Sequence, residues 1–299
     1  MTIRGAAGRP ARWRSRGRRA GIGAAAAVLL AGCGTSGSAS TGAGATAPAD
    51  GTLPPAHVHG VDVDPADGSL LLATHDGLLR IGEDGASSRV GPVIDLMGFT
   101  VAGPGRFLAS GHPGPGVDLP QPVGLIESTD GGRTWQPLSR QGQSDFHALT
   151  SSPAGVLGYD GSLLRSPDGT AWETAAIPAA PESLSASPDG GQVLATTQQG
   201  VLVSSDGGVS WSPVDGAPLL QMVDWGSDAA TVAGVDPAGA VWASVDAGRS
   251  WSQGAGLGAP PQGVTVSGSG AEVRIAVVTT SALMESRDGG RTFVEVLDI

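Results

Sequence analysis

One phrase of eight residues recurs along the chain and limits what it can fold into. It reads Ser-Thr-Asp-Gly-Gly-Arg-Thr-Trp over residues 128–135 and returns over 204–211, 244–251 and 286–293, with a shortened copy over 166–172. The central aspartates of the five copies are separated by 38, 38, 40 and 42 residues. They are Asp130, Asp168, Asp206, Asp246 and Asp288. A repeat of about 40 residues predicts an array of similar supersecondary units.

The sequence pattern from His57 to Ile299 is typical of β-structure. Short apolar runs alternate with turns rich in Gly, Pro, Asp and Ser, and no amphipathic helical stretch interrupts them. A sixth, degenerate unit precedes the five copies, with strand-like runs over 70–74 and 77–80 and a turn over 83–85. The sequence therefore predicts an all-β fold over 57–299, a six-bladed β-propeller of four-stranded antiparallel blades.

The repeated phrase has the chemistry of a tight turn. Aspartate accepts backbone N–H bonds, glycine permits positive φ, hydroxyl residues cap the loop, and the aromatic packs into the sheet. The phrase resembles the Asp-box, or BNR repeat, of sialidases, sortilin-type receptors and many secreted bacterial propellers. That resemblance implies a structural role for the five aspartates and says nothing specific about a reaction.

Other phrases extend the resemblance over the whole of 57–299. They stand at 57–60, 74–77, 95–99, 110–113 and 145–149. Together with the Asp-boxes they resemble a family of bacterial lipoproteins described as glycosyl hydrolase-like. The name of that family rests on the propeller, so the resemblance implies a fold and leaves the activity open.

The first 32 residues read as a lipoprotein signal peptide. Seven arginines and no acid precede an apolar run over 20–31, which is too short to span a bilayer as a helix. Leu30-Ala31-Gly32-Cys33 resembles a lipobox, which implies cleavage before Cys33 and diacylation of its thiol. Residues 33–56 are predicted to be a flexible linker of Gly, Ser, Ala and Pro. We therefore expect a protein anchored by lipid on the extracytoplasmic face of the cell membrane.

Charge narrows the range of partners. All 28 acidic residues follow Cys33 but only ten of the arginines do, which gives the mature chain a formal charge of −18. Nucleic acid is therefore excluded as a partner on electrostatic grounds. A small molecule, a metal ion, a glycan or another envelope protein remains compatible.

All five histidines are predicted to lie on one face of the propeller. If the Asp-boxes join the third and fourth strands of each blade, they mark one face, and the start of the first strand and the end of the second lie on the other. The histidines fall at these last two positions in the first three blades. Aligning the first strands places His59, Met97 and His147 together, and puts Leu184, Val223 and Val264 at the same position in the later blades. The sequence thus predicts a polar cluster confined to blades one to three.

This cluster is the candidate binding site. Its members are His57, His59, His75, Asp95, Met97, His112, Asp145 and His147. Imidazole with a thioether favours copper, and imidazole with carboxylate favours zinc. Two other interpretations stay open: a pocket for an organic ligand, with or without catalysis, and a set of hydrogen-bonded rim histidines without a ligand.

Enzymatic alternatives rest on the acidic residues near the same face. A sialidase would need three arginines and a tyrosine there, and the arginines map mostly to the Asp-boxes and to other strands. A glycoside hydrolase acting through two carboxylates is compatible with the sequence. Its candidates are Asp95, Asp118, Asp145, Asp160 and Glu182. A protein-interaction scaffold, which would need only the surface, is a third alternative.

Overall fold

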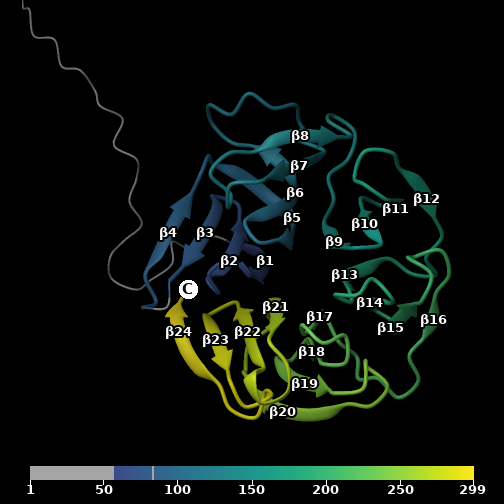
Figure 1. The fold of residues 1–299 in the computed structure, drawn as a ribbon. Coiled ribbons are helices and arrows are strands. Elements are labelled where there is room, and N and C mark those ends of the chain that lie inside the picture. Colours follow the sequence, from purple (N-terminus) through teal and green to yellow (C-terminus); the bar gives the residue numbers. More distant parts are fainter. Residues whose placement is uncertain (1–56, 83) are drawn as a thin grey trace, which may run out of the picture. The chain divides into compact units, whose positions relative to one another are not determined.

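Six antiparallel sheets of four strands each form the blades of a propeller (Figure 1). The structure is a computed structural model that describes residues 57–82 and 84–299. The strands of each blade follow one another in the chain, and the first strands of neighbouring blades contact each other all the way round, from β1 through β21 and back to β1. The all-β fold and the count of six blades are confirmed.

The strand bounds show how regular the repeat is. Blades one and two comprise β1 (Val58–Val63), β2 (Leu70–Thr74), β3 (Gly77–Ile81), β4 (Ser87–Val90), β5 (Ile94–Gly103), β6 (Arg106–Pro113), β7 (Leu125–Ser128) and β8 (Gln136–Ser139). Blades three and four comprise β9 (Ala148–Ser152), β10 (Gly155–Tyr159), β11 (Leu163–Ser166), β12 (Glu173–Ala175), β13 (Pro181–Ala186), β14 (Val193–Thr197), β15 (Gly200–Ser204) and β16 (Ser212–Pro213). Blades five and six comprise β17 (Met222–Trp225), β18 (Val232–Val235), β19 (Ala240–Ser244), β20 (Ser252–Gly256), β21 (Pro261–Ser267), β22 (Arg274–Thr279), β23 (Ala282–Ser286) and β24 (Val294–Asp298).

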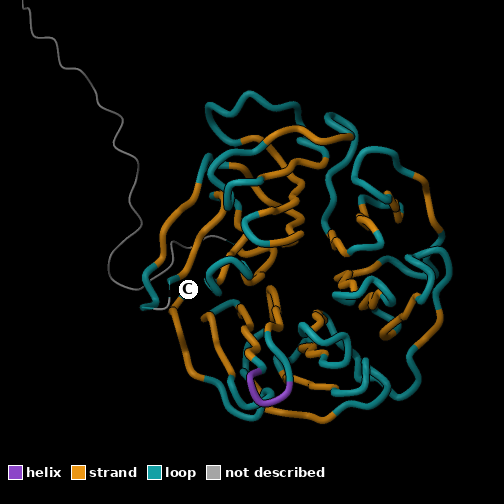
Figure 2. The backbone as a smooth tube through the Cα atoms, in the orientation of Figure 1, coloured by secondary structure: helices purple, strands orange, loops and turns teal. Residues whose placement is uncertain are grey.

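Helical structure is almost absent from the described part of the chain. A single 3-10 turn, Gly270–Glu272, interrupts the strands there (Figure 2). Within the same residues no helix has the length and apolar character needed to cross a membrane. The predicted signal peptide, Cys33 and linker lie outside the described residues.

The core lies between blades, because each sheet is covered on both faces by its neighbours. Every residue of β2 is buried, as expected for a strand packed on two sides. Leu71 and Phe107 pack in one cluster between blades one and two. Leu72 and Val278 belong to another cluster that joins blade six back to blade one. Apolar packing thus closes the ring without a strand shared between the first and last blades.

The five Asp-boxes join the third and fourth strands of blades two to six, as predicted. In blade four the backbone N–H of Ser210 donates to Oδ1 of Asp206 at 2.9 Å, and the Ser210 hydroxyl donates to Oδ2. Oδ1 also accepts a hydrogen bond from Ser204, and Nε1 of Trp211 donates to the carbonyl of Gly208. The two hydrogen bonds from Ser210, followed by the bond from the Ser204 hydroxyl, lower the pKa of Asp206 to about 2. Asp206 thus accepts hydrogen bonds from residues of its own turn, which is the role predicted for the five aspartates.

We expect Asp206→Ala to lower the melting temperature by several degrees, because the turn loses its acceptor for two donors of Ser210. Since the folded pKa lies below the ordinary 3.8, the stabilisation is present above pH 3.8 and is lost as the pH falls toward 2. Thermal unfolding at pH 7 and pH 3 tests this, with Asp206→Asn as the isosteric control. An unchanged melting temperature would show that the hydrogen bonds of Asp206 do not contribute to the stability of the fold.

A belt of polar side chains surrounds the channel at the centre of the ring. One member comes from each first strand: Asp62, Thr100, Thr150, Ser185, Asp224 and Thr265. The carboxylate of Asp62 accepts the backbone N–H of Val101 at 2.8 Å, and that of Asp224 accepts the N–H of Val266 at 2.9 Å. Each bond joins one blade to the next. The belt therefore fixes the first strands relative to one another and sets the position of the residues that precede it.

The register of the first strands corrects one prediction from the sequence. Three residues before the belt, His59, Met97 and His147 occupy equivalent positions, as predicted. In the other blades that position holds Glu182, Gln221 and Gln262, whereas Leu184, Val223 and Val264 were expected. A β-bulge at this position, seen for example between Val58 and Gly60 and between Pro181 and Ser183, inserts one residue and shifts the alternation of side chains.

Candidate functional site

A funnel opens at the end of the central channel that is opposite the Asp-boxes. Its volume is about 910 Å³, and residues from all six blades line it. It narrows into the channel beside the belt, since His59, His147, Glu182 and Gln262 line both spaces. No arginine is present among the described residues that line it. The set of three arginines that a sialidase requires is therefore not found in this lining.

Polar side chains line the mouth of the funnel from five of the six blades, and blade two contributes Met97 at the same position. Glu182, Gln221 and Gln262 complete the ring that His59, Met97 and His147 begin. The predicted restriction of polar groups to blades one to three is therefore wrong, although all the histidines lie on that side. The sequence does contain a pattern that identifies Glu182, Gln221 and Gln262, because each stands three residues before a polar residue of the belt. A spacing of three does not fit the two-residue alternation of a regular strand, because the bulge adds one residue.

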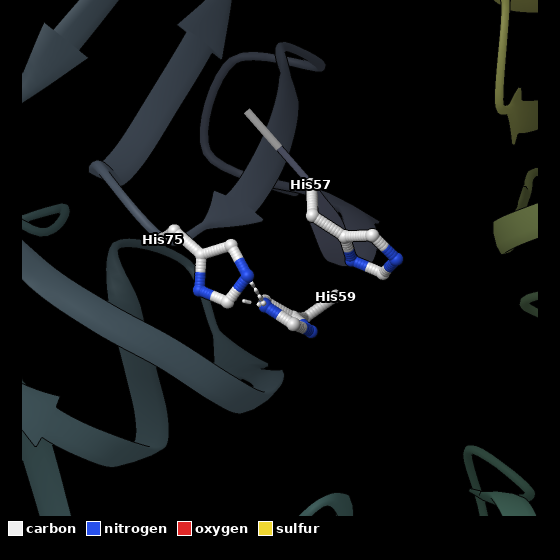
Figure 3. A group of neighbouring side chains, drawn as sticks. All are labelled: His57, His59 and His75. Atoms are coloured by element: carbon white, nitrogen blue, oxygen red, sulfur yellow. Dashed lines mark hydrogen bonds between the residues drawn. The ribbon is translucent and has the colours of Figure 1, made fainter. Parts of the chain in front are cut away.

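Three imidazoles converge at the edge of blade one (Figure 3). His57 and His59 come from the start of β1, and His75 comes from the turn between β2 and β3. One ring nitrogen from each lies within 4.8 Å of the others. The ring centres of His57 and His59 are 4.9 Å apart, and those of His59 and His75 are 4.3 Å apart. We call this group the histidine triad.

The spacing between His59 and His75 matches that of two ligands around one ion. Nε2 of His59 lies 3.3 Å from each ring nitrogen of His75. Two imidazole nitrogens bound tetrahedrally at 2.0–2.1 Å from zinc would be separated by about 3.3–3.4 Å. The two rings therefore already have the separation that a shared ion would impose on them.

Burial and charge keep the central imidazole neutral. Burial, followed by the neighbouring His75 and His57, lowers the pKa of His59 to about 4 against the opposing effect of Asp95. A neutral imidazole is the form that binds metal ions. His59 is the least exposed of the triad, with 12% of its side chain accessible, so it fixes the depth of the site.

Asp95 orients the triad from outside. Its Oδ1 lies 2.8 Å from Nδ1 of His75 and 3.8 Å from Nε2 of His59. When Nδ1 of His75 donates its proton to Asp95, Nε2 keeps a lone pair for an ion. Carboxylates commonly fix the tautomer of a metal-binding histidine in this way. The predicted grouping of Asp95 with the histidines is present in the structure.

The remaining predicted residues continue the same array. His112 lies 3.7 Å from Oδ2 of Asp95 through Nδ1 and 3.4 Å from Oδ2 of Asp145 through Nε2. His147 lies 3.0 Å from that same oxygen of Asp145. Met97 lines the funnel. The structure thus brings the eight residues predicted from the sequence to one side of the funnel.

The acidic residues considered for hydrolysis are more dispersed. Asp145, Asp160 and Glu182 line the funnel, whereas Asp118 is exposed and does not. Asp160 accepts a hydrogen bond from Ser144 and lies 4.0 Å from Arg140, so part of its charge is already balanced. Asp145 and Asp95 interact with histidines. Among these five carboxylates, Glu182 is the one that is exposed on the funnel wall.

Comparison with known proteins agrees with the repeat and the fold. Residues 126–137 match the family model of the BNR/Asp-box repeat. The chain is a six-bladed β-propeller that contains the Asp-box repeat. A search of curated proteins gave no match.

Solved structures similar to this Asp-box propeller have diverse roles. An ancestral GH74 enzyme has a TM-score of 0.55 at 14% identity, and the match covers 81% of this chain but 38% of the enzyme. YCF48 bound to D1 peptide has a TM-score of 0.50 at 19% identity, with 82% and 83% covered. A chain of the nidogen/laminin complex has a TM-score of 0.60 at 14% identity, with 76% and 92% covered. Identities this low show the fold alone.

Proposed function

We propose that this propeller binds a divalent ion of the zinc and copper class through His57, His59 and His75. The observation that supports this is the 3.3 Å separation between Nε2 of His59 and the ring nitrogens of His75. A third imidazole stands within 4.8 Å of both. Asp95 orients His75 as an outer partner.

The chemistry of the triad selects the class of ion. Calcium and magnesium prefer oxygen ligands, whereas imidazole suits zinc and copper. By the general order of affinities, copper(II) binds such a site more tightly than zinc does. Three protein ligands leave a fourth position, and in this site it would face the funnel. An ion there could hold a small molecule or a glycan by direct coordination.

The test is a titration of the purified full chain, without a polyhistidine tag and after treatment with a chelator. Zn²⁺ and Cu²⁺ are added at pH 7.5 and binding is followed by calorimetry. We expect stoichiometric binding by the parent, and we expect the His57→Ala, His75→Ala variant to lose the ion held by the triad. Unchanged thermal unfolding of the variant without metal shows that it is folded. A variant that binds exactly as the parent does would refute the proposal.

We also propose that the protein functions on the extracytoplasmic face of the cell membrane, tethered by lipid at Cys33. Support comes from the lipobox resemblance of Leu30-Ala31-Gly32-Cys33. With Cys33→Ala we expect the protein in the medium or as an unprocessed precursor, as seen by fractionation and mass spectrometry. Normal processing with continued membrane association would contradict the anchor.

A glycan or a peptide is the second candidate ligand, and the funnel wall favours it. Glu182 is exposed there, on blade four, in a space of about 910 Å³. The GH74 enzyme and the peptide-bound YCF48 have the same fold, which is compatible with either ligand. Glu182→Gln separates the candidates: it should abolish hydrolysis of a glycan by a carboxylate mechanism and leave metal binding unchanged.

A further inference from the structure

We propose that the funnel binds a ligand that carries several ammonium groups on aliphatic chains, as a linear polyamine does. These groups would contact Glu182 and Gln262 at the neck, where the funnel narrows into the channel, and Tyr159 on the wall. The volume of the funnel, about 910 Å³, is that of a pocket for a small organic ligand. The site uses none of the imidazoles of the histidine triad, so it is independent of the proposed metal ion.

The charge of the funnel selects a cation. The described residues that line it include the carboxylates of Asp145, Asp160 and Glu182 but neither arginine nor lysine. The chain as a whole is acidic, with a formal net charge of −11. A cleft lined by charges of one sign concentrates the electric field and attracts ligands of the opposite charge. An anionic ligand would be repelled by the same wall.

Glu182 is the carboxylate that is available to a ligand. Asp145 lies 3.0 Å from His147, and Asp160 accepts a hydrogen bond from the hydroxyl of Ser144. Among the described residues, no ion pair or side-chain hydrogen bond involves Glu182, which is exposed and lines both the funnel and its neck. An ammonium group can therefore pair with Glu182 without displacing a partner from the protein.

A second acceptor at the neck lacks a donor. Oε1 of Gln262 is buried and has no hydrogen-bond partner among the described residues. Gln262 lines the funnel and the neck together with Glu182. A buried carbonyl oxygen without a donor is unfavourable, because it has lost its hydrogen bonds to water. An ammonium group has three N–H donors and no acceptor, so it can bond to this oxygen and to a carboxylate at once.

The rest of the lining suits the methylene chains between ammonium groups. Met97, Met222, Pro181 and Pro261 line the funnel and offer apolar contacts. Tyr159 lines it as well and is half-buried, and the face of a tyrosine ring attracts an ammonium group. Acceptors at the neck, an aromatic ring on the wall and apolar surface in the same space fit an extended chain with several charges better than one compact cation.

Calorimetric titration with spermidine tests the proposal. The full chain is stripped of metal with a chelator, freed of the chelator and titrated at pH 7.5, above the ordinary pKa of imidazole of about 6.5. We expect one-to-one binding that weakens as salt is added. An uncharged diol of the same chain length should not bind. Glu182→Gln should weaken spermidine binding by about 10-fold or more, because a hydrogen bond between charged groups contributes at least that much to affinity.

Two further variants locate the binding site. Gln262→Leu removes the unpaired oxygen and should also weaken spermidine binding. Glu295→Gln is the matched control for Glu182→Gln, since it removes the same charge at an exposed position that does not line the funnel. It should bind spermidine as the parent does. Thermal unfolding of each variant shows that it is folded.

A peptide of three lysines with capped ends separates two sources of the same chemistry. Tighter binding of spermidine than of the peptide would assign the site to a free polyamine, and the reverse would assign it to lysine side chains of a partner protein. Absence of binding for both would overturn the proposal. So would an equal effect of Glu182→Gln and Glu295→Gln on binding. Because these titrations contain no metal, such a failure would leave the histidine triad as it stands.

Discussion

Replacing His59 with alanine is expected to weaken binding of the triad's ion by at least about 100-fold. Loss of an outer partner of a metal ligand costs 10–100-fold in affinity, and loss of a ligand should cost at least the upper end of that range. His59 is the central member, with ring centres 4.9 Å from His57 and 4.3 Å from His75. Without His59, the two remaining imidazoles, His57 and His75, have ring centres 5.8 Å apart and no ligand between them.

The measurement is a competition titration with Zn²⁺ against a chromogenic chelator at pH 7.5. The parent chain and its His59→Ala variant are measured under the same conditions, so that the difference between them reports on His59. Gln221→Ala is the matched control, because Gln221 holds the position of His59 in blade five and lines the same funnel. Equal affinities of the His59→Ala protein and the parent would show that His59 is not a ligand.

Two buried carboxylates of the belt, Asp62 and Asp224, are expected to contribute less to stability as the pH rises from 5 to 8. Burial raises the pKa of Asp62 and Asp224, and the charge of Asp224 raises that of Asp62 further. Each group binds its proton more tightly in the folded state than in the unfolded chain, where the value is 3.8. Its contribution is complete below pH 3.8 and falls away as the pH rises through the folded pKa.

Asp62→Asn isolates this contribution. The amide oxygen can still accept the N–H of Val101, but no charge develops at high pH. We expect the stability of the variant relative to the parent to rise between pH 5 and pH 8 by on the order of 1 kcal/mol or more. Comparison with the parent cancels the opposite trend of His59, whose lowered pKa makes stability rise between pH 4 and 6.5.

Denaturant unfolding at the two pH values provides the measurement. Asp215→Asn is the control, since it removes the same charge at an exposed position of this acidic protein. A constant difference between Asp62→Asn and the parent would mean that Asp62 does not change its protonation between pH 5 and pH 8, and it would contradict the prediction.

Most of the candidate site could be predicted from local sequence. His57, His59, Asp95 and His147 were placed on one face because each stands at the start of a first strand, and the Asp-boxes show which face that is. The part of the funnel wall that Gln221 and the equivalent residues of blades four and six form was not predicted. A β-bulge changes which side chain faces the channel, and nothing in the amino-acid types near it marks its position.

The sequence by itself determined the repeat, the strands and the turn chemistry, because these depend on contacts within about 40 residues of chain. The pairing of Asp145 with His112 and the two-sided position of Asp95 were decided only by the tertiary structure. Those contacts depend on the rotation of one blade against the next. That rotation is set by packing between sheets and by the belt, where Asp62 bonds to Val101 of the neighbouring blade. Interactions of this kind connect residues whose spacing along the chain carries no periodic signal.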